Sequence, residues 1–289
     1  MIIVAGSSNR LLSESLSAVT GFRIVPSEQR RFPDGECYVR VNGGLENHDV
    51  LIVSATFPDG NIVETLLLYD AVRRLRPSTI RLLIPYFGYQ RQDKLFREGE
   101  AVSAEVMAGL LDSKFDEIIT IDIHAEGVLS YFRHTGTLNF VASPEIARHF
   151  RARNIDVVIS PDGGMRAVEY AKEAARALNC SYDYFLKERI NANTVKLFPK
   201  NMDVSGKNVL VLDDIIATGG SMIAVLRRLQ DLGAASIFAG CTHGLFIGDA
   251  LQKIKALCSE VVSTDTIESS VSLVSVAPLV AHHLMETAR

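Results

Sequence analysis

The sequence predicts an α/β protein with two similar domains, each a mainly parallel sheet flanked by helices. Short runs of consecutive apolar residues alternate with helix-length amphipathic segments through almost all of the 289 residues. This is the pattern of parallel strands joined by helical crossovers. The length also suits two domains of about 100–200 residues each. In addition, an apolar run that leads to Pro-Asp-Gly occurs at 49–60 and again at 156–163, which suits a tandem pair of related domains.

The predicted strands are apolar at successive positions, as expected for strands that are covered on both faces. They span residues 2–5, 50–54, 80–85, 118–121, 157–160, 209–212 and 236–241. The helices predicted between them span residues 61–76, 103–113, 145–153, 165–178 and 221–232. We expect the domains to be 1–141 and 142–289, with the last helix a candidate to pack back on the N-terminal domain.

Composition excludes several classes of protein. The chain has 47% hydrophobic and 22% charged residues, enough to form a core and too apolar for global disorder. Lys and Arg number 30 against 34 Asp and Glu, and this net charge of −4 argues against a nucleic-acid-binding protein. The four cysteines form no CxxC pair, so we expect neither a disulfide framework nor a zinc site, and a cytoplasmic location. No signal peptide and no membrane span are expected.

The most informative segment follows the apolar run 209–212. It begins with Asp213-Asp214, continues to Ala217-Thr218-Gly219-Gly220-Ser221, and leads into a predicted helix. Two glycines between hydroxyl residues at a helix start can aim backbone N–H groups at a phosphate. Ionised carboxylates only accept hydrogen bonds, so they suit the vicinal hydroxyls of a sugar. The segment predicts a site for a phosphorylated pentose; the alternative is a plain strand–turn–helix junction with an Asp cap.

Two segments of the N-terminal half suit a nucleotide. In 31–36 (Arg-Phe-Pro-Asp-Gly-Glu), the ring of Phe32 can stack on a base while Asp34 and Glu36 accept hydrogen bonds from an exocyclic amine. Arg91 and Gln92 follow an aromatic cluster, and they offer donors to phosphate, base or sugar. Taken alone, each segment also fits a solvated loop or turn.

Three further positions are candidates for metal binding and catalysis. His124 and Asp162 each follow a predicted strand, at equivalent positions in the two sheets. If they faced each other across a cleft between the domains, they could hold Mg²⁺; a structural histidine is the alternative. Lys187 and Arg189 lie in the charged segment 187–193, which is typical of a mobile loop or a solvated hairpin tip.

Together these segments resemble, in the same order, the motifs of ribose-phosphate pyrophosphokinases. The 213–221 loop is shared with type I phosphoribosyltransferases, but 32–36, 85–94 and 187–189 are similar to segments of the pyrophosphokinases. The resemblance implies two phosphoribosyltransferase-like domains and transfer of the β,γ-diphosphoryl group of ATP to the 1-hydroxyl of ribose 5-phosphate. It also implies Mg²⁺ as cofactor and a homodimer or higher homo-oligomer whose nucleotide site is shared between subunits.

The resemblance assigns a role to each segment. It implies that Lys187 is catalytic, with Arg189 beside it, and that the metal is held by His124 and Asp162, with Asp122 a weaker candidate. It implies that Gly163 and Gly164 let backbone amides approach the diphosphate. The implied ATP-binding residues are Phe32, Asp34, Gly35, Glu36, Arg91, Gln92, Asp93 and His124. The implied ribose 5-phosphate-binding residues are Arg189, Asp213, Asp214, Ala217, Thr218, Gly219, Gly220 and Ser221.

Two rival functions stay open at this point. A nucleobase phosphoribosyltransferase would share the 213–221 loop, yet it would not need the adenine-binding segment, the 91–92 segment or two similar domains. A regulatory subunit of the same fold should have lost Lys187, Arg189 or the pair of His124 and Asp162, and all four are present. Ala217 stands where family loops often carry an acid or Ser, a small change that leaves the amide cradle intact.

Overall fold

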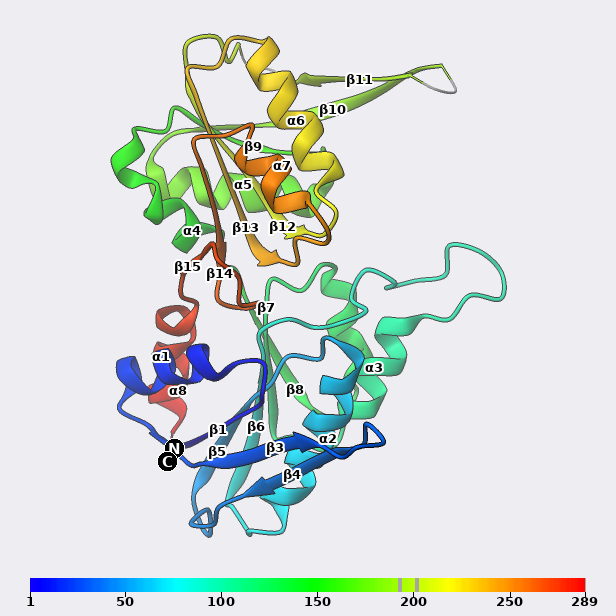
Figure 1. The fold of residues 1–289 in the computed structure, drawn as a ribbon, viewed down its shortest axis with the longest axis vertical. Helices are drawn as coiled ribbons and strands as arrows, with labels where there is room; N and C mark the ends of the chain where they lie inside the picture. Colours follow the sequence, from blue (N-terminus) through cyan, green and yellow to red (C-terminus); the bar gives the residue numbers. More distant parts are fainter. Residues whose placement is uncertain (192–193, 201–202, 289) are drawn as a thin grey trace. The chain divides into compact units, whose positions relative to one another are not determined.

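The computed structural model describes residues 1–191, 194–200 and 203–288, with side chains for all of these except 187–198. The chain forms two compact units (Figure 1). Unit 1 contains Met1–Phe140 together with residues 275–288, and unit 2 is Val141–Val274. Unit 1 is therefore built from both ends of the chain.

Unit 1 contains a six-stranded parallel sheet in the order β2-β1-β5-β6-β7-β8. Its strands are β1 (Ile2–Ala5), β2 (Arg23–Ile24), β5 (Asp49–Val53), β6 (Thr79–Ile84), β7 (Glu117–Ile121) and β8 (Gly136–Phe140). Its helices are α1 (Arg10–Thr20), α2 (Asp59–Arg73), α3 (Ser103–Leu111), the 3-10 helix η1 (Glu126–Tyr131) and α8 (Ala277–Thr287).

Helices cover both faces of this sheet. All of β5 is buried, and its residues Val50 and Ile52 share a core cluster with Leu68 of α2 and Ala108 of α3. Figure 1 shows α1 and α8 on the side of the sheet opposite to α2 and α3, and Leu12 of α1 is fully buried there. This double covering explains why the strands are apolar at every position.

Unit 1 also carries an antiparallel hairpin that the sequence patterns did not predict. Its strands are β3 (Ser27–Arg31) and β4 (Cys37–Val41), and Arg31 pairs with Cys37 beside the turn. The segment 32–36 is that turn. Because β3 reads Ser-Glu-Gln-Arg-Arg, it has no apolar run by which it could be recognised as a strand.

Unit 2 contains a seven-stranded sheet in the order β11-β10-β9-β12-β13-β14-β15, in which only the β10–β11 pair is antiparallel. Its strands are β9 (Val157–Ser160), β10 (Ser181–Asn191), β11 (Thr194–Pro199), β12 (Asn208–Ile216), β13 (Ser236–Gly244), β14 (Glu260–Thr264) and β15 (Ser272–Val274). Its helices are α4 (Ser143–His149), the 3-10 helix η2 (Arg151–Arg153), α5 (Met165–Leu178), α6 (Gly220–Asp231) and α7 (Ala250–Lys255).

Successive residues of β9 pack into different core clusters. Val157 and Ile159 share a cluster with Leu226 of α6, whereas Val158 shares one with Ala171 of α5. The alternation follows from the two-residue period of a strand. Helices therefore cover both faces here as well, and the predicted fold class is confirmed.

The two parallel sheets have the same topology. If β11 is left out and the six remaining strands of each sheet are numbered along the chain, both sheets have the strand order 2-1-3-4-5-6. By this order β9 corresponds to β1, and β12 corresponds to β5. The Pro-Asp-Gly motif that suggested the repeat follows β5 in one unit and β9 in the other, so it does not join equivalent strands. The two units are similar, but that motif is not evidence for it.

Several predicted boundaries were wrong, and three of the differences bear on the site. β12 continues past residue 212 because it stays paired with β13 as far as Ile216 and Gly244, so Asp213 and Asp214 lie within the strand. The helix expected at 145–153 is two pieces, α4 and η2. Residues 187–191 of the expected loop belong to β10, and residues 192–193 lie outside the described residues. In the part of the chain that the structure describes, no helix has both the length and the apolar character needed to cross a bilayer.

Candidate active site

The ATP-binding residues predicted in unit 1 follow the carboxyl ends of two neighbouring strands. Arg91, Gln92 and Asp93 come after β6, and His124 comes after β7, which pairs with β6 in parallel. The carboxyl ends of parallel strands lie at one edge of the sheet, where ligands of such folds bind. The fold therefore brings both groups of residues to one edge of unit 1.

The segment that carries Arg91 is tied to its surroundings by main-chain contacts. The Gly88 N–H donates to the Thr56 hydroxyl at 2.7 Å, and the Thr56 N–H donates to the Tyr86 carbonyl at 3.1 Å. The Tyr131 hydroxyl donates to the Asp93 carbonyl at 2.7 Å. A Cβ at position 88 would lie 2.3 Å from the Thr56 carbonyl oxygen, so only glycine fits there.

His124 is positioned through its main chain. Its N–H donates to Oε1 of Gln90 at 2.8 Å, and the neighbouring Ile123 N–H donates to Oδ1 of Asn139 at 3.0 Å. The His124 side chain is half-buried, so it stays accessible. Asp122 is fully buried, which limits this weaker metal candidate to a role beneath the ligands.

The hairpin turn holds the other nucleotide residues in a defined shape. The Phe32 N–H donates to the Glu36 carbonyl at 2.8 Å, and Gly35, at φ +93°, donates its N–H to the Phe32 carbonyl at 2.9 Å. The Asp34 carboxylate accepts the Glu36 N–H at 3.0 Å. The Arg30 guanidinium lies 4.9 Å from the centre of the Phe32 ring. Phe32, Asp34 and Glu36 are all exposed on this turn.

The start of α2 connects the hairpin to the segment of Arg91. The Arg31 guanidinium packs so closely on Gly60 that a Cβ there would meet Nη2 at 2.4 Å. The Tyr89 hydroxyl donates to the Asp59 carboxylate at 2.9 Å. Because both contacts reach the first turn of one helix, the two predicted nucleotide segments converge at the same edge of unit 1.

In unit 2, the pentose loop ends at the start of α6. Gly219 has φ +75° and precedes the helix, whose first turn carries no acidic residue and receives no side-chain cap from Gly219. The Ile247 N–H donates to the Ala217 carbonyl at 2.9 Å, which anchors the loop. Thr218, Gly220 and Ser221 are exposed. Backbone N–H groups at a helix start, together with exposed hydroxyls, form a site suited to a phosphate.

Carboxylates of two neighbouring strands meet at this edge. Asp213 and Asp214 lie near the carboxyl end of β12, which continues to Ile216, while Asp162 follows β9, its partner in the sheet. Burial, followed by the negative charges of Asp214 and Asp162, raises the pKa of Asp213 well above its usual range. The pKa of the buried Cys241 thiol next to Asp213 is raised mainly by burial too. The three carboxylates therefore lie close enough to repel one another, an arrangement found where a cation or a sugar hydroxyl binds.

The turn after β9 is shaped by the side chain of Asp162, within the turn, and by Tyr184, which packs against it. The Gly164 N–H donates to the Asp162 carboxylate at 2.8 Å. A Cβ on Gly163 would lie 2.9 Å from the ring of Tyr184, which packs against the turn. The Lys200 ammonium donates to the Tyr184 hydroxyl at 2.6 Å. Lys200 and Tyr184 were not among the predicted site residues, since nothing in their sequence surroundings indicates this contact.

Lys187 and Arg189 lie on a strand rather than in a loop. Both belong to β10, the neighbour of β9, and pair with Leu197 and Val195 of β11. Their side chains lie outside the described part of the structure. The predicted catalytic pair is thus carried by the β10–β11 hairpin, on the strand next to the one that leads to Asp162.

The predicted metal ligands belong to different units, His124 to unit 1 and Asp162 to unit 2. Within the described residues, no cluster of three or more His, Cys, Asp and Glu side chains could hold a metal ion unaided. The donors suit Mg²⁺ by their chemistry: Asp162 offers carboxylate oxygens, and both Asp162 and His124 are only half-buried. Mg²⁺ prefers such oxygens and completes its shell with water and substrate phosphates.

The equivalent turn of unit 1 is already filled by a protein carboxylate. Ser7 follows β1, the counterpart of β9, and both its N–H and its hydroxyl donate to Glu64 of α2, at 2.7 and 2.8 Å. Glu64 is itself buried. The two units share a topology, but the carboxylate that fills this turn comes from a neighbouring helix in unit 1 and from the turn's own Asp162 in unit 2.

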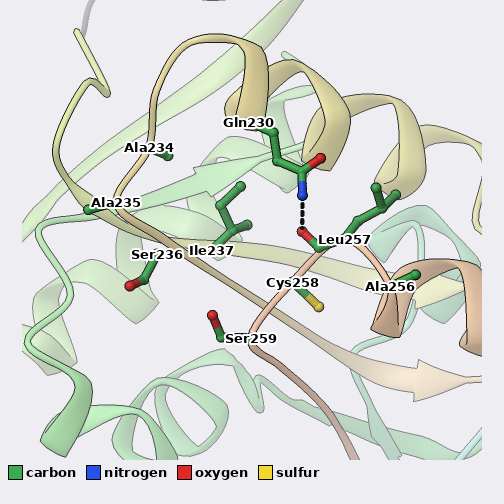
Figure 2. Close-up of a pocket in the computed structure, with 9 residues that line it drawn as sticks. All are labelled: Gln230, Ala234, Ala235, Ser236, Ile237, Ala256, Leu257, Cys258 and Ser259. Atoms are coloured by element: carbon green, nitrogen blue, oxygen red, sulfur yellow. Dashed lines mark hydrogen bonds between the residues drawn. The ribbon is translucent and has the colours of Figure 1, made fainter.

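A hollow of about 260 Å³ opens at the other end of the sheet in unit 2 (Figure 2). Ser236 begins β13 and Ser259 precedes β14, so the hollow lies at the amino ends of these strands, away from the carboxylates. Gln230 crosses it to donate to the Leu257 carbonyl at 3.2 Å. Its full lining is Gln230, Ala234, Ala235, Ser236, Ile237, Ala256, Leu257, Cys258 and Ser259.

The fold and the loops define a class of protein: a pair of phosphoribosyltransferase-type α/β units. Residues 1–114 match the N-terminal domain of ribose phosphate pyrophosphokinase, and residues 142–278 match the phosphoribosyl transferase domain. The chain belongs to the ribose-phosphate pyrophosphokinase family.

Individual relatives agree with this membership over the full chain. The ribose-phosphate pyrophosphokinase of Methanothermobacter thermautotrophicus is 39% identical, covering 97% of this chain and 98% of that protein. The enzyme of the same name in Thermococcus kodakarensis is 36% identical, covering 96% and 98%. The crystal structure of phosphoribosylpyrophosphate synthetase from Mycobacterium smegmatis aligns with a TM-score of 0.83 at 26% identity, covering 98% and 97%. The predicted family, fold class and function, that of a ribose-phosphate diphosphokinase, are confirmed.

Proposed function

We propose that each unit supplies one substrate site for this diphosphoryl transfer, ATP on unit 1 and ribose 5-phosphate on unit 2. The observation that carries the proposal is the start of α6, where exposed loop residues with two hydroxyls follow a strand whose carboxylates repel one another. A pentose phosphate offers both partners that such a site needs, a phosphate and a vicinal diol.

The ribose 5-phosphate site uses the whole segment from Asp213 to Ser221. The backbone and hydroxyls of the loop hold the 5-phosphate, which the exposure of Thr218, Gly220 and Ser221 supports. The loop residues are Ala217, Thr218, Gly219, Gly220 and Ser221. Asp213 and Asp214 accept hydrogen bonds from the 2- and 3-hydroxyls. The 1-hydroxyl is then directed toward the nucleotide.

The ATP site is formed by the residues that converge on the edge of unit 1. The Phe32 ring stacks on adenine, and Asp34 and Glu36 accept hydrogen bonds from its amino group, with Gly35 shaping the turn. Arg91, Gln92, Asp93 and His124 face the sugar and phosphates. The main-chain contacts that hold Gly88 and His124 support this assignment, because they fix the segment before substrate binds.

In the reaction, the 1-hydroxyl oxygen of ribose 5-phosphate attacks the β-phosphorus of ATP. A bond forms between these two atoms, the bond from the β-phosphorus to the α,β-bridging oxygen breaks, and AMP leaves with that oxygen while the hydroxyl proton is lost. Lys187 and Arg189 stabilise the charge that develops on the transferring group. Gly163 and Gly164 let backbone amides approach the diphosphate.

His124 and Asp162 would hold Mg²⁺, with Asp122 supporting from beneath. When bound, the ion supplies positive charge to the phosphate oxygens and orients the triphosphate. Asp213 and Asp214 remain on the sugar side. The carboxylate oxygens of Asp162 and the accessibility of both half-buried side chains support this assignment.

The assembly is a homodimer or a larger homo-oligomer whose nucleotide site is shared between subunits. The exposed Phe32, at 37% of its surface, supports this, because a stacking residue on a protruding turn can reach a neighbouring chain. A cytoplasmic location is supported by the free thiols of Cys37, Cys180, Cys241 and Cys258, which suit a reducing compartment.

One assay separates the alternatives. AMP is measured after mixing the protein with ATP and Mg²⁺, with and without ribose 5-phosphate. Formation of AMP that depends strictly on ribose 5-phosphate is expected. Release of diphosphate from phosphoribosyl diphosphate on adding a nucleobase would indicate a phosphoribosyltransferase instead, and no turnover in either assay would indicate a regulatory subunit.

A further inference from the structure

Gln90 is a fully buried polar side chain between two loops at the nucleotide edge of unit 1. It precedes Arg91, on the segment after β6. Its Oε1 accepts the main-chain N–H of His124, which follows β7, at 2.8 Å. Gln90 thus joins by one hydrogen bond the two loops that carry the predicted phosphate and metal residues.

The orientation of the Gln90 amide follows from this bond. Exchanging its oxygen and nitrogen would place an NH₂ group against the N–H of His124, two donors facing each other. With Oε1 on His124, Nε2 is buried and has no hydrogen-bond partner among the described residues. A buried unpaired donor is unfavourable. A leucine of similar size would avoid that cost, but it would leave the His124 N–H unpaired instead.

Both loops have a residue with positive φ close to the Gln90–His124 bond. Tyr89, next to Gln90, has φ +66°, and Asp122, two residues before His124, has φ +41°. Non-glycine residues adopt such angles only where surrounding contacts hold them. The Asp122 N–H donates to the Phe140 carbonyl at 2.8 Å. The Gln90 bond ties the bent part of the segment after β7 to the bent part of the segment after β6, and the Tyr131–Asp93 bond joins the two segments further along.

We propose that Gln90 is a positioning residue for the nucleotide site: through the main chain of His124 it sets that imidazole in register with Arg91 and Gln92. Gln90 is too deeply buried to touch ATP itself. The proposal rests on the proposed function, in which these three residues face the triphosphate. On this proposal, a residue that does not itself bind ATP determines where the triphosphate is held.

The test is equilibrium binding to the full-length protein, measured by calorimetry with a non-hydrolysable ATP analogue and Mg²⁺, and separately with ribose 5-phosphate. Gln90→Met keeps the volume and removes the acceptor. We expect its Kd for the analogue to rise about tenfold, since misplacing a positioned group commonly costs this much or more. The Kd for ribose 5-phosphate, which binds to unit 2, should not change.

Two further variants make the result specific. Gln90→Glu keeps an oxygen at Oε1 and should restore analogue binding to within about threefold of the wild type. Ser13→Ala is the matched control: it removes another buried side-chain hydrogen bond of unit 1, to the Asn9 carbonyl at 2.8 Å, on α1. Should Gln90→Met fail to fold, Gln90→Asn, one methylene too short to reach His124, carries the same expectation.

The possible failures can be told apart. If the wild type binds neither ligand, the proposed function is wrong. Suppose that the wild type binds both ligands and that His124→Ala weakens binding of the analogue. If the Gln90 variants then bind the analogue as well as Ser13→Ala does, only the role of Gln90 is overturned. The role of Gln90 would also be overturned if Gln90→Met weakened the binding of both ligands equally, because that result would indicate a general loss of structure.

Discussion

Replacing Gly88 by alanine should damage the nucleotide site through the backbone alone. The added Cβ would lie 2.3 Å from the Thr56 carbonyl oxygen, so the two segments must separate by about 1 Å to reach an ordinary contact. Neither can yield freely, because the Gly88 N–H donates to the Thr56 hydroxyl and the Thr56 N–H to the Tyr86 carbonyl. At least one of these bonds must lengthen.

The expected cost has two parts. Overpacking at a buried contact should lower the free energy of unfolding by about 1–3 kcal/mol. Moving the segment of Arg91 by about 1 Å should raise the KM for ATP by roughly tenfold to a hundredfold. The KM for ribose 5-phosphate should stay constant, because its loop is in unit 2. Urea denaturation measures the first effect, and initial rates of AMP formation at varied ATP measure the second.

Gly109→Ala is the matched control. Gly109 lies within α3, and a Cβ there would meet nothing within 4 Å. The substitution should therefore raise stability by about 1 kcal/mol through helix propensity and leave both KM values unchanged. If Gly88→Ala behaved like this control, the close approach of Gly88 to Thr56 would not be what positions the ATP segment.

The other predictions concern catalysis and pH. Lys187→Ala should lower kcat by roughly 10²–10³ or more, and a wild-type kcat in this variant would remove Lys187 from the mechanism. Because the pKa of Asp213 is raised on folding, its contribution to stability is present below its unfolded pKa and lost as pH rises through the folded one. Asp213→Asn should therefore stabilise the ligand-free protein at pH 7 by about 0.5–2 kcal/mol, as stabilising changes commonly do, and should weaken ribose 5-phosphate binding. Equal shifts of the urea midpoint at pH 4 and pH 7 would contradict this expectation. The hydrogen bond from His149, and then that from Arg153, lower the pKa of Glu260 against the effect of burial, so its contribution is present above its unfolded pKa and lost as pH falls through the folded one. In Glu260→Gln, the urea midpoint should therefore fall less steeply as the pH is lowered than it does in the wild type. An equally steep fall would show that Glu260 does not contribute in this way.

Local pattern was enough for the frame of the molecule and for the turn into α6. The strand at β9 and the helix at α5 were predicted with the ends that the structure has. Consecutive apolar residues indicate burial on both faces whatever their partners are. The Gly219-Gly220 pair indicates a tight turn into a helix for a reason equally local, the freedom of glycine at positive φ.

Contacts between distant segments could not be read in this way. The hairpin of β3 and β4 is held by pairing between polar strands, and Asp213 lies inside β12 only because β13 runs beside it. Gly88 owes its identity to a carbonyl 32 residues earlier in the chain, and Gln90 bonds to a main-chain N–H 34 residues later. Periodicity is a property of one segment, whereas such a contact exists only after the sheet has set two strand ends side by side. The residues that we propose to bind the substrates could thus be named from the sequence, but the residues that hold them in place emerge only from the folded arrangement.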